Sequence, residues 1–181
     1  MNSNTHGKYA IVLTHNRPQL LELCVAAIGP QVDLTIIIDN ASNPPVMNTF
    51  KPNPSIVVRD SEQPPNLSRL WNVGMDSVAL HAEVSDEQTW DIAFLCDDAI
   101  VPAGWFDIVA TGMREHDATV ASTHCANPVG APILKTARDG DVWNRMCPWA
   151  FIMRGERSFP ADEDLKWWWG DTYVDFTARQ N

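Results

Sequence analysis

The chain has 181 residues, 45% of them hydrophobic and 20% charged, which is enough for one domain with a sizeable core and too few for two comfortable ones. Lys and Arg total 13 against 23 Asp and Glu, and the formal charge of -10 repels phosphate backbones, so nucleic acid is excluded as a general partner. The chain contains no apolar run near the ~20 residues that span a bilayer and no signal-peptide pattern at its start. The four cysteines form no CxxC pair. We therefore expect a single domain over 1–181, cytoplasmic, with reduced thiols and no membrane span.

Strand and helix patterns alternate through the first two-thirds of the chain. Apolar runs at Tyr9–Leu13 and Leu34–Asp39 predict strands buried on both faces. Between them, a helix is predicted from Pro18 to the stop at Gly29-Pro30. This spacing is typical of a βαβ unit with parallel strands and a right-handed crossover.

The remaining elements continue the alternation. Further strands are expected at 55–59, 90–95, 118–122 and 149–154, and further helices at 66–81, from 105 to about 113, and as two short pieces around Gly170 after 162. The predicted fold is α/β, with a mostly parallel central sheet, helices on both faces and a C-terminal third that covers one edge.

Polar clusters follow three of the predicted strands. They read "THNR" at 14–17, "DNAS" at 39–42 and "CDD" at 96–98. Ligands of open parallel sheets bind outside the carboxyl ends of the strands, so these clusters should converge on one edge. The chain has no GxGxxG motif after the first strand and no P-loop motif, which counts against ordinary dinucleotide and P-loop sites.

Two adjacent carboxylates, Asp97 and Asp98, end the predicted strand at 90–95. Neighbouring like charges repel unless a cation or hydrogen-bond donors offset them, and Mg²⁺ or Mn²⁺ bridging to a diphosphate does so directly. That chemistry predicts a nucleotide ligand. The pair alone is more simply explained by turn formation or helix capping before Pro102.

Five segments together resemble one known family. They are "IVLTHNRPQLLELCVAAI", "IIIDNAS", "NLSRLWNVGMDS", "FLCDDAIVPAGWF" and "WWWGDTYVDFTAR", and their order and approximate spacing are similar to those of family-2 glycosyltransferases of the GT-A fold, from about Lys8 to Arg179. The resemblance implies a metal-dependent, inverting transferase that moves a sugar from a nucleotide diphosphate donor, with UDP favoured, to a hydroxyl of a glycan or protein acceptor. Residues 8–123 would then bind the nucleotide, and residues 124–181 would supply the acceptor side and the catalytic base.

The resemblance also implies roles for single residues. Thr14 and Asp39 would hold the base, Asp97 the ribose, and Asp98, with Asp97 beside it, the Mn²⁺ or Mg²⁺. Cys96 stands where many relatives have Asp or Asn, which leaves the site one hard ligand short. The full set of expected nucleotide contacts is Thr14, Asn16, Arg17, Asp39, Arg69, Asn72 and Asp97.

The C-terminal segment carries the expected base. The match to the family's acidic motif is Asp171, with Gly170 in place of a Glu, and a carboxylate there would take the proton of the acceptor hydroxyl. Asp171 is equally consistent with the N-cap of a terminal helix. The acidic residues at 162–164 are rival bases, although they look more like a solvated first helical turn.

Three consecutive tryptophans cannot all enter one core from a helix, since successive residues point ~100° apart. We therefore expect Trp168 and Trp169 to offer a platform for a sugar ring or an apolar acceptor. A plug at the sheet edge or in a homodimer contact fits them about as well. His15 and His124 are better explained as satisfied loop histidines than as ligands.

The same residues allow an alternative function without catalysis. Cys96, Gly170 and the short C-terminal region are also consistent with a catalytically weak or inactive protein that binds a nucleotide sugar on the same fold.

Overall fold

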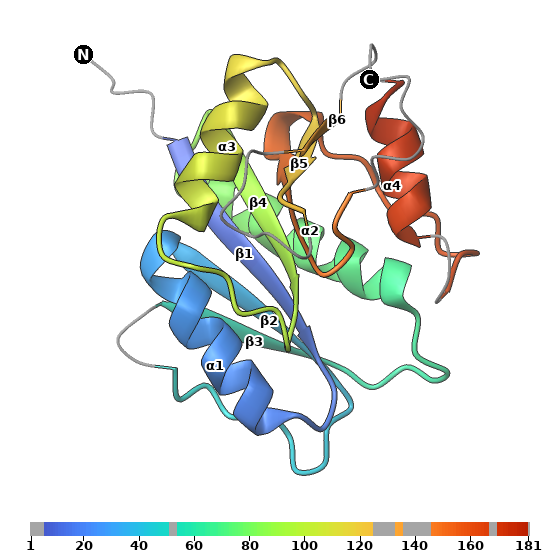
Figure 1. The fold of residues 1–181 in the computed structure, drawn as a ribbon. Coiled ribbons are helices and arrows are strands. Elements are labelled where there is room, and N and C mark those ends of the chain that lie inside the picture. The colour runs from blue at the N-terminus through green and yellow to red at the C-terminus, as the bar shows by residue number, and fades with distance from the viewer. Residues whose placement is uncertain (1–5, 51–53, 125–132, 136–145, 167–169, 181) are drawn as a thin grey trace.

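The computed structural model describes residues 6–50, 54–124, 133–135, 146–166 and 170–180, with 133–135, 170 and 171 described by their backbone alone. A twisted sheet lies at the centre, with helices packed on both sides of it (Figure 1). The strands are β1 (His6–Thr14), β2 (Leu34–Asn40), β3 (Ser55–Asp60), β4 (Thr89–Cys96), β5 (Val120–Ser122), β6 (Ile133–Lys135) and β7 (Ala150–Arg154). The helices are α1 (Pro18–Ile28), α2 (Leu67–Val84), α3 (Trp105–Glu115) and α4 (Gly170–Ala178), with 3-10 turns at Gly29–Gln31 and Gly155–Arg157.

The strand order in the described part of the sheet is β3-β2-β1-β4-β7-β5-β6. β3, β2, β1 and β4 pair in parallel, whereas β7 runs antiparallel between β4 and β5. The α/β class and the mainly parallel sheet are therefore as predicted. The chain moves outward from β1 through β2 to β3 and then returns to the other side of β1 with β4. The strand order thus reverses between β1 and β4, and ligand sites of open α/β sheets form at such a point.

The C-terminal third is not placed as predicted. Instead of covering one edge, its strand β7 enters the sheet and pairs along β4, from Asp91 opposite Arg154 to Leu95 opposite Ala150. β7 is buried almost throughout, so its apolar residues complete the core rather than cap it. Which strand becomes the neighbour of β4 depends on contacts between segments far apart in the chain, and local periodicity carries no information about them.

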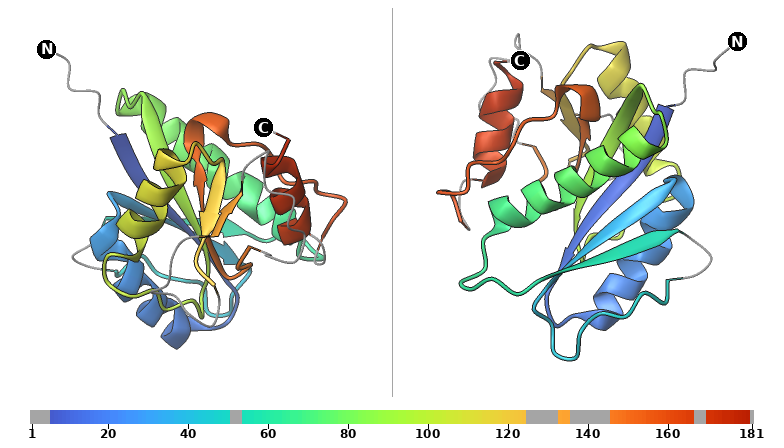
Figure 2. Two further views of the ribbon diagram at one scale, coloured as in Figure 1. Left: turned by 45° about the horizontal axis from the view of Figure 1, so that its top comes forward. Right: turned by 180° about the vertical axis from the view of Figure 1, so that it is seen from behind.

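The core forms two layers, one on each face of the sheet. α1 and α3 cover one face, which we call the α1 face, and α2 and α4 cover the other, which we call the α2 face (Figures 1 and 2). All seven residues of β2 are buried, as expected for a strand covered on both sides. Side chains alternate between the layers, so Ile37 joins the α1-face core while Ile36 and Ile38 join the α2-face core.

Local sequence explains where the helices begin and end. α1 starts with Pro18 at its first position, where the missing N–H costs nothing, and gives way to a 3-10 turn at Gly29. α2 starts after Asn66, whose side-chain oxygen accepts a hydrogen bond from the backbone N–H of Arg69 at 3.1 Å. Gly74 lets α2 lie close to β1, because a Cβ there would stand 2.6 Å from Cγ2 of Ile11.

Of the two helical pieces expected after residue 162, the described residues, 162–166 and 170–180, contain one helix. α4 follows Gly170, but Asp162–Leu165 forms a turn closed by a 3.0 Å bond from the backbone N–H of Leu165 to the carbonyl of Asp162. Side chains of α2 hold this segment. The Asn72 amide accepts from the Ala161 N–H at 2.8 Å and donates to the Ala161 carbonyl at 3.0 Å, and the Ser68 hydroxyl donates to the Leu165 carbonyl. These bonds use backbone groups that a helix would need for itself.

Candidate functional site

The carboxyl ends of β1 and β4 meet where the strand order reverses. Thr14 ends β1, and its hydroxyl donates to Oδ2 of Asp97, the residue after β4, at 2.8 Å. Both side chains are almost completely buried. Burial of a carboxylate is costly unless donors or a cation satisfy it, so Asp97 depends on the partners that surround it.

Arg17 supplies the counter-charge to both members of the carboxylate pair. Its Nη1 lies 3.3 Å from Oδ1 of Asp97 and 3.2 Å from Oδ2 of Asp98. The two carboxylates differ sharply in environment, because the side chain of Asp97 is 6% exposed and that of Asp98 is 49% exposed. Asp97 is therefore an internal anchor, whereas Asp98 presents its carboxylate to solvent and to any ligand.

Two thiols lie beneath the carboxylates. Burial, and then the charges of Asp98 and Asp97, raise the pKa of Cys96 to about 11, with Arg17 acting in the opposite direction. Burial also raises the pKa of Cys24 to about 12, and its thiol points to the carbonyl of Cys96 at 3.5 Å. Both thiols are protonated at neutral pH, and thus neither offers the thiolate that metal ions and electrophiles require.

Asp39 lies one strand away from this pair and anchors its own loop. Its oxygens accept from the backbone N–H groups of Ser42 at 2.9 Å and Val46 at 3.1 Å, and from Nη1 of Arg59 at 2.8 Å. Burial acts to raise the pKa of Asp39, but the hydrogen bonds from Ser42 and Val46 and the charge of Arg59 outweigh it and lower the pKa. In this conformation both carboxylate oxygens are already used.

His15 and Asn16 join the β1 loop to the β2 loop. Nδ1 of His15 donates to the carbonyl of Asn40, and its Nε2 accepts from the Asn16 amide at 2.9 Å, which assigns the tautomer. Asn16 also donates its backbone N–H to the Ser42 hydroxyl at 2.9 Å and accepts from the N–H of Asn43 at 2.7 Å. His15 is thus a satisfied loop histidine, as expected, and Asn16 joins the two loops.

Arg69 and Asn72 lie on α2, on the far side of the sheet from Arg17. Arg69 forms ion pairs with Asp60, at the end of β3, and with Glu62 at 3.1 Å. Asn72 is occupied with the 161–163 segment. Of the expected nucleotide contacts, the structure therefore brings Thr14, Arg17 and Asp97 into direct contact and joins Asn16 and Asp39 to them through the Ser42 loop. It does not bring Arg69 and Asn72 into contact with these five residues.

The pleat of the sheet explains this separation. Thr14 pairs in register with Asp39, and Asp39 pairs with Arg59, so these side chains leave the sheet on the α1 face. Asn40 and Asp60, one position further along their strands, leave on the α2 face, where Arg69 meets Asp60. A ligand that touched both groups would have to lie across the ends of the strands.

A pocket of about 360 Å³ opens beside Asp98 at the ends of β4 and β5 and the start of β7. This volume falls within the ~300–1,000 Å³ typical of small-molecule sites. Its floor includes Trp105, whose indole N–H donates to the Thr123 hydroxyl at 3.1 Å. His124 and Trp149 also line it, and Trp149 is 55% exposed. We call this the Asp98 pocket.

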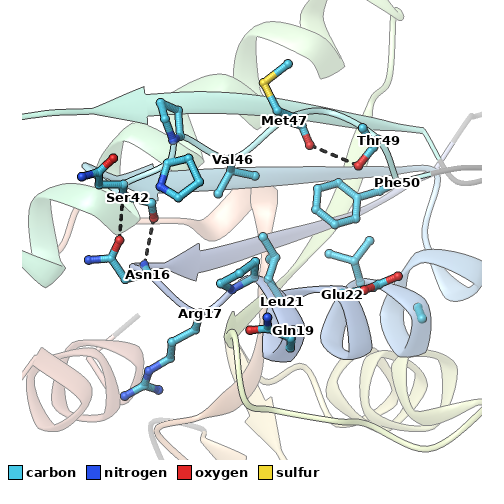
Figure 3. A pocket seen from close by; sticks show the side chains of 16 residues that line it. Asn16, Arg17, Gln19, Leu21, Glu22, Ser42, Val46, Met47, Thr49 and Phe50 are labelled. Carbon is cyan, nitrogen blue, oxygen red and sulfur yellow. Dashed lines mark hydrogen bonds between the residues drawn. The ribbon is translucent and has the colours of Figure 1, made fainter.

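A larger pocket, of about 650 Å³, lies between α1 and the 42–50 segment (Figure 3). The bonds of Asn16 to Ser42 and Asn43 close one end, and Phe50 lies toward the other. Arg17 lines it, but its guanidinium extends away from Val46 and Phe50 (Figure 3). The same guanidinium contacts the carboxylates of Asp97 and Asp98. Arg17 therefore stands between this pocket and the Asp98 pocket.

The residues at the strand ends suit only a loosely held divalent cation. Within the described ranges, no three His, Cys, Asp or Glu side chains converge to hold a metal ion. Asp97 already accepts from Thr14 and Arg17, which leaves Asp98 as the available carboxylate. One carboxylate is compatible with Mg²⁺ or Mn²⁺ when substrate phosphate oxygens and water complete the coordination.

Part of the expected site falls on residues with limited description. Trp168 and Trp169 lie outside the described residues. Asp171 is the second residue of α4, which packs on the α2 face through Val174 and Ala178, and only its backbone is described.

Sequence reasoning missed two residues of this region. Arg59 neutralises Asp39, and the alternation of β3 could have found it, because a basic residue paired in register with a buried Asp is an ion-pair candidate. Trp149 was assigned to a strand, but β7 begins one residue later and leaves it exposed. No local pattern distinguishes the last loop residue from the first strand residue.

Comparison of the chain with protein-family models and with curated proteins yields no match. The class defined by the fold is thus an α/β domain with a polar cluster at its topological switch point. No helix of the described residues has the length and apolar character needed to cross a bilayer.

Proposed function

We propose that the protein is a metal-dependent, inverting glycosyltransferase of the GT-A type, which moves a sugar from a nucleotide diphosphate donor, with UDP favoured, to an acceptor hydroxyl. One observation carries the proposal. A buried carboxylate, Asp97, and an exposed one, Asp98, are held by a single guanidinium, Arg17, at the switch point of the sheet and at the wall of a pocket.

The charges at this place suit a diphosphate. Arg17 is 54% exposed and donates to the carboxylates through Nη1, so its guanidinium has donors free to turn toward phosphate oxygens, which match its planar geometry. Asp98 would then hold Mn²⁺ or Mg²⁺ against the same phosphates. When bound, such a cation offsets the negative charge that develops on the leaving diphosphate.

The buried side of the site keeps these groups in place. Thr14 fixes Asp97 through its hydroxyl, and Asp97 in turn fixes the position from which Arg17 reaches the phosphates. Asp97 is also the candidate for the ribose hydroxyls. Asp171 is the proposed general base that takes the proton from the acceptor hydroxyl as the oxygen attacks the anomeric carbon from the face opposite the diphosphate. A positioned base of this kind contributes ~10²–10⁴-fold to the rate.

The test of the nucleotide site is calorimetric titration of UDP with and without Mn²⁺. Wild type should bind more tightly with the metal, and Asp98→Ala should lose that dependence because the available carboxylate is gone. Asp107→Ala removes a carboxylate from α3 that is exposed as well and pairs with Lys8, and this variant should behave as wild type. Metal-dependent UDP binding that survives intact in Asp98→Ala would rule out the metal assignment.

The test of the base separates binding from chemistry. Asp171→Asn keeps the size of the side chain and removes its basicity, so transfer should be abolished while UDP affinity stays within about twofold of wild type. Full transfer activity in this variant would refute its role.

A non-catalytic nucleotide-sugar-binding protein on the same fold is the second candidate. The observation that favours it is that Arg17 contacts both carboxylates and Thr14 donates to Asp97, which is a stable arrangement without catalysis. Measuring the metal-dependent release of UDP from sugar nucleotides distinguishes the transferase from the binding protein. Slow donor hydrolysis supports the enzyme, whereas tight binding with no hydrolysis and no transfer supports the binding protein.

A further inference from the structure

We infer that the Asp98 pocket receives the sugar of the donor and that Trp149 is the surface on which the sugar ring stacks. The inference rests on the proposed function, because it takes the diphosphate to lie at Arg17 and Asp98. It assigns the sugar platform to a residue other than Trp168 and Trp169. That residue directly precedes β7 and lines the pocket beside Asp98.

The first argument is continuity with the carboxylates. Asp98 belongs both to the charged pair and to the wall of the pocket. The sugar is the next group along the donor after the diphosphate, so a diphosphate at Asp98 directs the sugar into the adjoining space. The pocket combines an aromatic surface, Trp149, with the polar groups of Asp98, Thr123 and His124. That mixture suits a pyranose, which has apolar C–H faces and a rim of hydroxyls.

The second argument is the environment of Trp149. Its side chain is more than half exposed, although tryptophan is costly to leave in water. Its backbone, by contrast, is fixed, because its carbonyl accepts from the N–H of Cys96 at 3.0 Å. Cys96 directly precedes the carboxylate pair, so this bond fixes the backbone of Trp149 next to Asp97 and Asp98. An aromatic side chain on a fixed backbone near a charged anchor is well placed to position a ring-shaped ligand.

The segment leading to Trp149 is also held. The N–H of Cys147 donates to the Ser122 hydroxyl at 3.0 Å, which ties this segment to the end of β5. The buried Trp105 supports the floor through its bond to Thr123. The walls of the pocket are therefore fixed from two strands before any ligand enters.

The experiment compares ligands with and without the sugar. Calorimetric titrations with Mn²⁺ use UDP and then UDP-glucose, UDP-galactose and UDP-N-acetylglucosamine, on wild type, Trp149→Leu and Trp149→Phe. Leu keeps an apolar side chain without a ring, and Phe keeps a ring. Ile108→Ala is the matched control, since Ile108 is also about half exposed but lies on α3 outside the lining of the Asp98 pocket.

For the sugar nucleotide that wild type binds most tightly, Trp149→Leu should lose on the order of tenfold in affinity, the scale of one aromatic contact. UDP affinity in that variant should stay within about twofold of wild type. Trp149→Phe should recover most of the loss, and Ile108→Ala should leave the affinity for both ligands within about twofold of wild type.

Three results would overturn the inference. If Trp149→Leu binds the sugar nucleotide as wild type does while wild type binds UDP, the nucleotide site stands and the platform is wrong. If UDP and the sugar nucleotide weaken equally, Trp149 supports the nucleotide site or the fold rather than the sugar. If wild type binds none of the four ligands, the proposed function fails and the sugar site fails with it.

Discussion

Arg17 is the side chain whose removal tests the charge balance of the site most directly. The guanidinium lies 3.3 Å from Asp97 and 3.2 Å from Asp98, so two carboxylates share one positive charge. Arg17→Ala removes the guanidinium that contacts both carboxylates, and the local net charge changes from about one negative to two. A diphosphate approaching this place would then meet repulsion instead of a phosphate-binding cation.

The size of the effect follows from the exposure of the groups. Two unit charges about 5 Å apart interact by ~3 kcal/mol at an effective dielectric constant of ~20 and by ~1 kcal/mol in water. Because Arg17 and Asp98 are each about half exposed, the lower part of this range applies. We expect UDP affinity to fall by roughly 5–30-fold, which corresponds to about 1–2 kcal/mol. Folding should lose about 1–3 kcal/mol, because the buried Asp97 loses its charged partner and keeps the Thr14 hydroxyl.

The assay is calorimetric titration of UDP at low and at high ionic strength. The difference between wild type and Arg17→Ala should shrink with added salt, since salt screens exposed charges. Arg157→Ala is the control. Arg157 follows the end of β7 that pairs with Asp91, far along β4 from Asp97, and its ion pair with Asp117 should not affect UDP affinity. Unchanged or tighter binding of UDP by Arg17→Ala would refute the reasoning.

Three further predictions concern stability. The side chain of Asp91 is completely buried and accepts two bonds from Arg114, at 2.7 and 2.9 Å, so Arg114→Ala should cost about 3 kcal/mol in urea unfolding, and a loss below ~1 kcal/mol would contradict this. Gly74→Ala should lower the free energy of unfolding by about 1–3 kcal/mol, and with it the Tm, despite better helix propensity, because the new Cβ would meet Ile11, and an unchanged Tm would count against the close packing. The pKa of Asp39 is lowered in the folded state, so its contribution is complete above its ordinary value of ~3.9 and is lost as pH falls through the folded-state pKa. Asp39→Asn should therefore be less stable than wild type at pH 7, with the gap closing in acid, and a gap independent of pH would disprove the assignment.

Local sequence patterns were enough to predict most helices and strands in the first two-thirds of the chain. The helix from Pro18 ends at Ile28, next to the predicted stop at Gly29, and the strand predicted at 34–39 extends over Leu34–Asn40. Apolar periodicity and the residues that begin and end helices act within a few residues of one another, so they are readable from sequence. The segment after 162 differs because its backbone bonds to side chains of α2, nearly a hundred residues earlier.

Some features of the candidate site could likewise be predicted from the sequence, and others could not. The sequence placed Thr14 and Asp97 at strand ends, and parallel pairing brought them together. The sequence did not reveal that Asp39 is used by its own loop, or that Arg69 pairs with Asp60 on the other face. Those contacts depend on the face of the sheet to which each side chain points and on how the loop after β2 folds back onto Asp39.

By itself, the sequence determined the α/β class, the positions of most strands and helices, and the clustering of polar residues at the carboxyl ends of the strands. These follow from hydrophobic periodicity and from the rule that parallel strands end at a common edge. Tertiary structure alone decided that β7 enters the sheet beside β4 and leaves Trp149 exposed near Asp98, and that Arg17 spans both carboxylates. The physical reason is that strand order and ion pairing join residues 50 to 80 positions apart, where the free energy of the whole packed core selects the partner.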